Sequence, residues 1–172
     1  MSFRVVAIPL QIAEQVRATL KSPQYGHPAH VEVATGYGPC RLCLRTFDEN
    51  HENRILFNYN PFEGLDSYPS PGPIFIHEQP CEPFTCVNEF PELIRRLPLV
   101  FEAYGKGRQL FVQERLRGAD AEESIERLFQ QPGVEYLHVR NEEAGCFIAQ
   151  VDRVQVEVSD PEFVNSVLSC LC

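Results

Sequence analysis

Apolar residues in the first half of the chain form short runs that proline- and glycine-containing turns separate. The β-branched run over residues 3–9, which Pro9 closes, predicts a strand. A helix is predicted next, because apolar residues recur four positions apart at Ile12, Val16 and Leu20. Three further strands are predicted over the alternating residues 31–33, the run 54–59 and the short run 74–76.

The second half of the chain has a more regular pattern, with two hairpins on either side of a helix. Two strand-like runs flank Gly105-Lys106-Gly107, so residues 99–115 are predicted to form a β-hairpin. Asp120, followed three positions later by Glu123, is typical of a helix start. A second hairpin is predicted from the strands 134–140 and 145–153.

This order of elements predicts an α+β fold with a single domain over residues 1–172. Hairpin, helix and hairpin in succession favour a mostly antiparallel or mixed sheet with a few helices. A doubly wound α/β fold would instead alternate strands with crossover helices throughout. Irregular loops rich in cysteine and proline should connect the elements of the first half. The longest covers residues 60–73, and long loops in compact domains often carry function.

Charge and composition exclude several classes of partner. The chain has 24 Asp and Glu against 15 Lys and Arg, a net charge of −9, so phosphate backbones would repel it and nucleic-acid binding is not expected. No apolar run approaches the roughly 18 residues of a membrane span, and the run near the start is too short for a secretory signal. We therefore expect a cytoplasmic protein without a membrane partner. Its seven cysteines should then be reduced and serve metal binding, chemistry or burial rather than disulfides.

Ligating side chains are concentrated between Gly38 and Cys86, a stretch that holds four of the seven cysteines and two of the five histidines. Cys40 and Cys43 have the two-residue spacing with which one turn can present two sulfurs to a zinc ion. The remaining ligands would come from downstream, where His77 and Cys81 lie four positions apart. The sequence therefore predicts a metal set of Cys40, Cys43, His77 and Cys81.

Two features of the same stretch speak against zinc. Leu44 stands where many zinc knuckles carry glycine, and no second C-x-x-C motif follows the first. The alternative is that these cysteines are buried and pack as small hydrophobic residues, as free cysteines commonly do.

Catalytic thiol chemistry is a further interpretation of this region. Arg41 and Arg45 are close in sequence to Cys40, and nearby cations favour the nucleophilic thiolate. His77 could act as the base for Cys40, which makes these two residues the catalytic candidates. A small, perhaps anionic, substrate would then contact Arg41, Arg45 and Tyr68, the last of which lies in the proline-rich loop.

These motifs together resemble a family of uncharacterised proteins, the domain of unknown function 1203 family. The matching segments are Gly38-Pro39-Cys40-Arg41 with Cys43-Leu44, residues 56–61, 72–77 and 93–104, and residues 134–139 through Gly145-Cys146 to Arg153. The resemblance covers about residues 3–153 and leaves 154–172 as a C-terminal extension. It implies a small soluble protein and assigns no catalytic residue, because the family has no established activity.

The function expected from the sequence is a small binding module with a structural zinc site at the Cys40/Cys43 loop. Its partner would be a small molecule or a protein. The alternative is a thiol-dependent enzyme that uses Cys40 with His77. Metal content distinguishes the two, because a complete zinc shell occupies the thiolates that a catalytic mechanism needs free.

Overall fold

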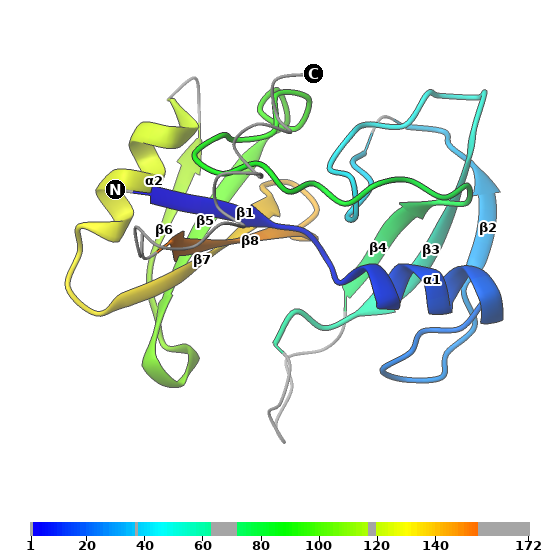
Figure 1. Ribbon diagram of the computed structural model, residues 1–172, viewed down its shortest axis with the longest axis horizontal. Coiled ribbons are helices and arrows are strands. Elements are labelled where there is room, and N and C mark those ends of the chain that lie inside the picture. The colour runs from blue at the N-terminus through cyan, green and yellow to red at the C-terminus, as the bar shows by residue number, and fades with distance from the viewer. Residues whose placement is uncertain (1, 37, 63–71, 117–119, 155–172) are drawn as a thin grey trace, which may run out of the picture. The chain divides into compact units, whose positions relative to one another are not determined.

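The computed structural model describes residues 2–36, 38–62, 72–116 and 120–154, and these residues form eight strands and two α-helices (Figure 1). The elements are β1 Ser2–Val6, α1 Leu10–Thr19, β2 His30–Val33, β3 Asn53–Tyr59, β4 Gly72–His77, β5 Leu99–Gly105, the 3₁₀ turn η1 Lys106–Arg108, β6 Leu110–Leu116, α2 Ala121–Phe129, β7 Val134–Asn141 and β8 Phe147–Val154. The strands and helices named above are present among the described residues. The fold is dominated by antiparallel sheet and agrees with the predicted α+β class.

Contacts group the described residues into two compact units. One contains residues 2–6, 84–116, 120–145 and 149–154, and the other contains residues 7–36, 38–62, 72–83 and 146–148. Strand β8 therefore begins in one unit and continues in the other. Whether the two units unfold together as one domain stays a prediction. Residues 63–71, with most of the long loop, and residues 155–172, with most of the C-terminal extension, lie outside the described residues.

The first unit is a five-stranded sheet with the order β1-β8-β7-β5-β6. Helix α2 lies against β7 and buries an apolar face that includes Ile125, Leu128 and Phe129. Asp120 caps this helix as predicted, because its side chain accepts hydrogen bonds from the Glu122 and Glu123 N–H groups. The helix is thus held at its start by a local cap and along its length by burial.

Hydrogen bonds to the Glu122 side chain connect the start of α2 with the segment that precedes β5. Its carboxylate accepts two hydrogen bonds from the Arg95 guanidinium, at 2.8 and 2.6 Å, and one from the Phe90 N–H at 3.0 Å. These charge-assisted bonds are of the strong kind and replace the water that burial removes from the carboxylate.

The second unit contains α1, the Cys40 loop and a three-stranded antiparallel sheet with the order β2-β3-β4. Its core follows the two-residue period of the strands. Ile55 of β3 is paired with Ile76 of β4, Phe57 is paired with Ile74, and all four side chains are buried. The rigid end of β4 in this core positions the candidate site described below.

Among the described residues, neither α-helix has the length and apolar character needed to cross a membrane.

Candidate metal centre

A tight turn presents the first two cysteines. The Cys40 N–H donates to the Arg45 carbonyl at 2.8 Å, and the Leu44 N–H donates to the Cys40 carbonyl at 2.9 Å. Leu44 takes a left-handed backbone conformation with φ of 56°, which costs a residue with a side chain about 1–2 kcal/mol. Leu44 thus adopts the conformation for which zinc knuckles use glycine, and the burial of its side chain, which is 1% exposed, offsets the strain.

Main-chain hydrogen bonds fix this turn to strand β4. The Arg41 N–H donates to the Phe75 carbonyl at 3.0 Å, and the Arg41 carbonyl accepts from the Ile8 N–H at 3.1 Å. His77 is the last residue of β4, and Cys81 follows in the irregular segment after the strand. Two ligating side chains from the turn and two from the end of β4 therefore reach the same place.

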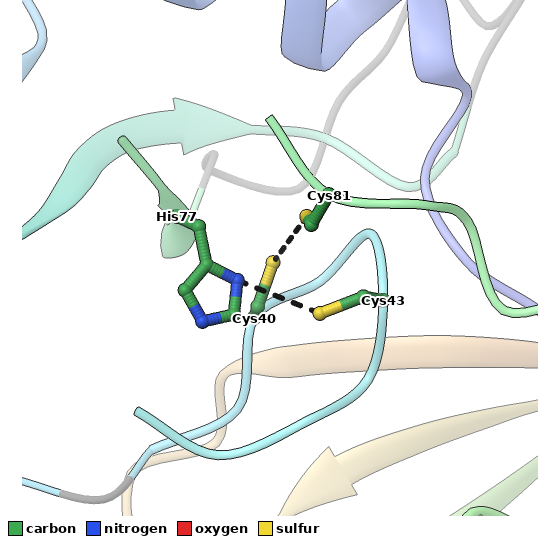
Figure 2. A group of neighbouring side chains, drawn as sticks. All are labelled: Cys40, Cys43, His77 and Cys81. Carbon is green, nitrogen blue, oxygen red and sulfur yellow. Dashed lines mark hydrogen bonds between the residues drawn. The ribbon is translucent and has the colours of Figure 1, made fainter. Parts of the chain in front are cut away.

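The four predicted ligands form one group (Figure 2). The Cys40 and Cys81 sulfurs are 3.9 Å apart, Cys43 Sγ lies 3.5 Å from His77 Nδ1, and all four donor atoms lie within 4.8 Å of one another. A tetrahedral zinc ion, with bonds of about 2.3 Å to sulfur and about 2.0–2.1 Å to nitrogen, separates two sulfurs by about 3.8 Å and a sulfur from a nitrogen by about 3.6 Å. These two contacts already match a tetrahedral site, and no other pair of donor atoms is more than 4.8 Å apart.

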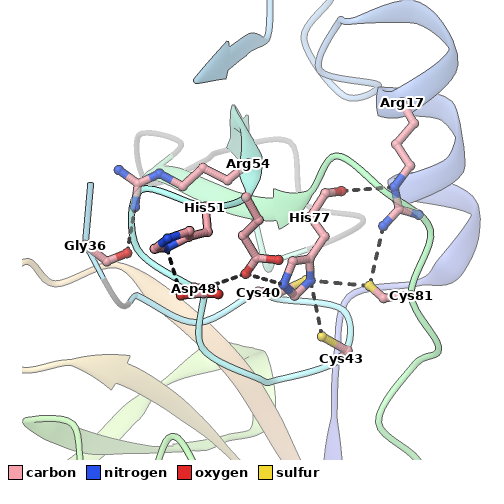
Figure 3. A network of polar contacts seen from close by, with 10 residues as sticks. Arg17, Gly36, Cys40, Cys43, Asp48, His51, Arg54, His77 and Cys81 are labelled. Carbon is pink, nitrogen blue, oxygen red and sulfur yellow. Dashed lines mark hydrogen bonds and ion pairs between the residues drawn. The ribbon is translucent and has the colours of Figure 1, made fainter. Parts of the chain in front are cut away.

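Burial of this group requires compensation for the charge of its thiolates. Cys40, Cys43 and His77 are buried, whereas Cys81 is half-buried. The Arg17 guanidinium of α1 donates to Cys81 Sγ at 3.5 Å and to the His77 carbonyl at 3.1 Å (Figure 3). The exposed side chain of Arg45 contacts Cys43, and this hydrogen bond raises the pKa of Arg45. Two cations therefore face the sulfurs.

A carboxylate orients the histidine. Glu52 Oε1 lies 3.3 Å from His77 Nε2, while His77 Nδ1 faces Cys43. The same Glu52 oxygen accepts the Asp48 N–H at 2.6 Å, which holds the carboxylate in place. This is the arrangement in which a metal-binding histidine donates its second N–H to a carboxylate, so that the tautomer and the ring orientation are set. Nδ1, which faces Cys43, is therefore the ring atom that a metal ion would bind.

The thiols and the imidazole share protons within the group. Hydrogen bonds with Cys40 and Cys81 hold the pKa of Cys43 far below that of an ordinary thiol, and hydrogen bonds with Cys40 and Cys43 raise the pKa of Cys81. Burial alone would lower the pKa of His77, but its hydrogen bonds to Cys40 and Cys43 outweigh burial and raise that pKa to about 10. These shifts favour a thiolate at Cys43 beside a protonated His77 when no metal is bound, and binding a divalent cation would release protons from the group.

The model for the family "Protein of unknown function (DUF1203)" matches residues 37–153, which is more than half of the chain and includes all four residues of the group. The chain belongs to the DUF1203 family. No curated protein and no solved structure is significantly similar to the chain. The DUF1203 match ends at residue 153, where the resemblance was expected to end, but it begins at residue 37 rather than near residue 3. Helix α1 and its Arg17 therefore precede the matched part.

The remaining candidates inside the DUF1203 match occupy different environments. Arg41 is 3% exposed and donates to the main-chain carbonyls of Phe147 at 2.8 Å and Pro39 at 2.5 Å. Burial lowers the pKa of Arg41 to about 10. Arg45 is exposed beside Cys43, and Tyr68 lies outside the described residues. Ligand binding by these three residues stays a prediction.

Sequence reasoning missed both residues that support the group from outside. Arg17 lies on the partly exposed side of α1, and Glu52 lies in a turn before β3. Arg17 is 64 positions from its partner Cys81. No pattern in a single sequence identifies such pairs, because other arginines and glutamates at the surface cannot be distinguished from Arg17 and Glu52 by their neighbours in the sequence.

The expectation that disulfides are absent was wrong at Cys86. Cys40, Cys43, Cys81 and Cys146 are thiols, but Cys86 is disulfide-bonded. The four thiols include every cysteine of the candidate group, so the correction leaves that group intact.

Proposed function

We propose that this DUF1203 protein is a small binding module whose Cys40 loop is held by one structural zinc ion. The ligands would be the thiolates of Cys40, Cys43 and Cys81 and Nδ1 of His77. The observation that carries the proposal is the position of four donor atoms from distant parts of the chain within 4.8 Å of one another.

The chemistry of the donors favours zinc over other cations. Three sulfurs and one imidazole nitrogen form a soft donor set, which suits zinc and disfavours the oxygen-binding cations magnesium and calcium. Four protein ligands also leave no open position for water or substrate, which is the feature of structural rather than catalytic zinc sites. The role supported is therefore to hold the Cys40 turn against the end of β4.

The binding function is proposed for the surface beside this centre. A pocket of about 480 Å³ is lined by residues of α1 and of the segment around Cys81, namely Leu10, Glu14, Arg17, Ala18, Pro80, Cys81 and Glu82. Apolar and charged groups line it together, which is typical of small-molecule sites. A zinc ion that holds Cys81 in place would also hold one wall of this pocket.

Elemental analysis of the untagged protein tests the metal. About one equivalent of zinc is expected per chain, and Cys40→Ser should lose it, because serine offers a harder and neutral donor. Cys146→Ser is the matched control, since Cys146 is a thiol outside the group. Removing zinc with a chelator should lower the melting temperature, because a ligand of the native state stabilises it. Zinc-free protein whose melting temperature does not respond to zinc or chelator would overturn the proposal.

The thiol-dependent enzyme is the second candidate, and the contact of 3.5 Å between His77 Nδ1 and Cys43 Sγ favours it. Such a pair can act as nucleophile and base, with Cys40 as the neighbouring thiol and a small anionic substrate at Arg45. Alkylation separates the two candidates. A catalytic thiolate reacts rapidly in the protein as purified, whereas zinc-bound thiolates should react only after the metal is removed.

A further inference from the structure

Cys81 differs from the other three ligands in its access to solvent. Cys40 and Cys43 are buried, with exposed fractions of 0% and 6%, whereas Cys81 is half-buried and lines the 480 Å³ pocket beside α1. A small reagent that enters this pocket therefore reaches the Cys81 sulfur first.

Two groups that oxidation chemistry needs already lie beside this sulfur. The Cys40 sulfur is 3.9 Å away, and the Arg17 guanidinium donates to Cys81 Sγ at 3.5 Å. A disulfide requires the sulfurs to approach to about 2.05 Å. Cys81 lies in an irregular segment, which can make this movement more easily than a residue in a strand.

From this arrangement we propose that Cys81 is an oxidation site for small hydroperoxides, and that Cys40 is the thiol that converts the oxidised form into a disulfide. The proposal rests on the proposed function in one respect, because zinc would keep both sulfurs as thiolates. In the first step the Cys81 thiolate attacks one peroxide oxygen, the O–O bond breaks, and the products are Cys81 sulfenic acid and an alkoxide that takes a proton from water. The alkoxide departs beside the positive charge of Arg17.

In the second step the Cys40 thiolate attacks the Cys81 sulfur, an S–S bond forms, and hydroxide leaves. The two thiolates together supply two electrons, which reduce one hydroperoxide to one alcohol, or to water if the reagent is hydrogen peroxide. The disulfide removes two of the four ligands at once. Cys43 and His77 alone form too small a set to hold zinc firmly, so each disulfide releases one metal ion.

The test treats the zinc-loaded full chain, prepared without oxygen, with hydrogen peroxide or tert-butyl hydroperoxide. The measurements are peptide mass mapping and zinc release to a chromophoric chelator. A Cys40–Cys81 disulfide should form together with one equivalent of released zinc. In the same zinc-loaded protein, dimedone added with the peroxide should trap sulfenic acid on Cys81, in competition with disulfide formation, about tenfold faster than on Cys146, which is neither a lining residue of the pocket nor a member of the group.

Arg17→Met separates reactivity from folding, because it removes the guanidinium and keeps the apolar stem. In protein loaded with one equivalent of zinc before the reaction, so that any change in zinc affinity does not enter the comparison, it should slow disulfide formation severalfold. A zinc-loaded protein that forms a Cys40–Cys43 disulfide instead, or that oxidises at Cys146 as fast as at Cys81, would overturn the proposal without affecting the zinc site. Protein that is purified without zinc, does not respond to added zinc and still forms the Cys40–Cys81 disulfide would support the oxidation site and overturn the zinc site alone.

Discussion

Glu52 supports the candidate metal centre through His77 without binding the metal itself. Its Oε1 lies 3.3 Å from His77 Nε2 and accepts the Asp48 N–H at 2.6 Å. Loss of such a carboxylate typically weakens metal affinity by about 10–100-fold, because the ring is less basic and less well oriented. Glu52→Gln keeps the shape and one acceptor oxygen, so we expect a loss of about tenfold, or about 1.4 kcal/mol. Glu52→Ala removes the hydrogen bond as well, and a loss approaching 100-fold is expected.

The assay is competition for zinc with a chromophoric chelator at neutral pH, with wild type, Glu52→Gln, Glu52→Ala and Glu49→Gln measured together. Glu49 is the control, because it is an exposed carboxylate on the same turn and its substitution changes the net charge by the same amount. Circular dichroism of each variant without metal checks that folding is unaltered. Equal weakening by Glu49→Gln and Glu52→Gln would refute the reasoning, since only overall charge, and not orientation of His77, would then matter.

Two further predictions concern stability. Leu44→Gly relieves about 1–2 kcal/mol of strain from the left-handed backbone conformation but removes a buried leucine side chain that contributes about 3–5 kcal/mol. Denaturant unfolding should therefore show a net loss of stability of about 1–4 kcal/mol, with the zinc content unchanged. A variant more stable than wild type would contradict this prediction. Burial of Glu122 would raise its pKa, but the Arg95 guanidinium and the Phe90 N–H outweigh burial and lower that pKa to about 2. The carboxylate therefore stabilises the fold at pH values above the unfolded-state pKa of about 4.3, and this stability is lost as the pH falls towards 2. Glu122→Gln should therefore lower the melting temperature by several degrees at neutral pH, with a difference that shrinks towards zero near pH 2. Glu123→Gln, at an exposed position of the same turn, should show little change at any pH. A melting-temperature difference for Glu122→Gln that does not vary with pH would exclude the ion pair as its cause.

Local patterns in the sequence were sufficient for the elements of this fold. The runs 54–59 and 74–76 predict two strands, and in the structure Ile55 and Phe57 of the first are paired with Ile76 and Ile74 of the second. The Asp120 cap similarly predicts the first turn of α2. Such signals are local, so they can be recognised without knowledge of the rest of the chain.

The division into two compact units could not be predicted, because it depends on pairings between distant segments. Strand β1, at the start of the chain, pairs with β8, at the end of the described residues, with Phe3 opposite Arg153. The candidate ligands were predictable as residue types with a characteristic spacing. Their supporting residues Arg17 and Glu52 were not, because their roles come from where α1 and the turn before β3 lie in the folded unit.

The contact between Cys43 and His77 joins residues that are 34 positions apart, so a metal ion at this place would act as a cross-link that closes a long loop. The entropic cost of closing a flexible loop rises only with the logarithm of its length. Ten residues inserted between these ligands would raise that cost by only about 0.2 kcal/mol, which is a factor of about 1.5 in affinity. As far as loop entropy is concerned, the irregular connections between the Cys40 turn and the end of β4 can therefore change length at little cost, whereas the two-residue spacing within the turn cannot.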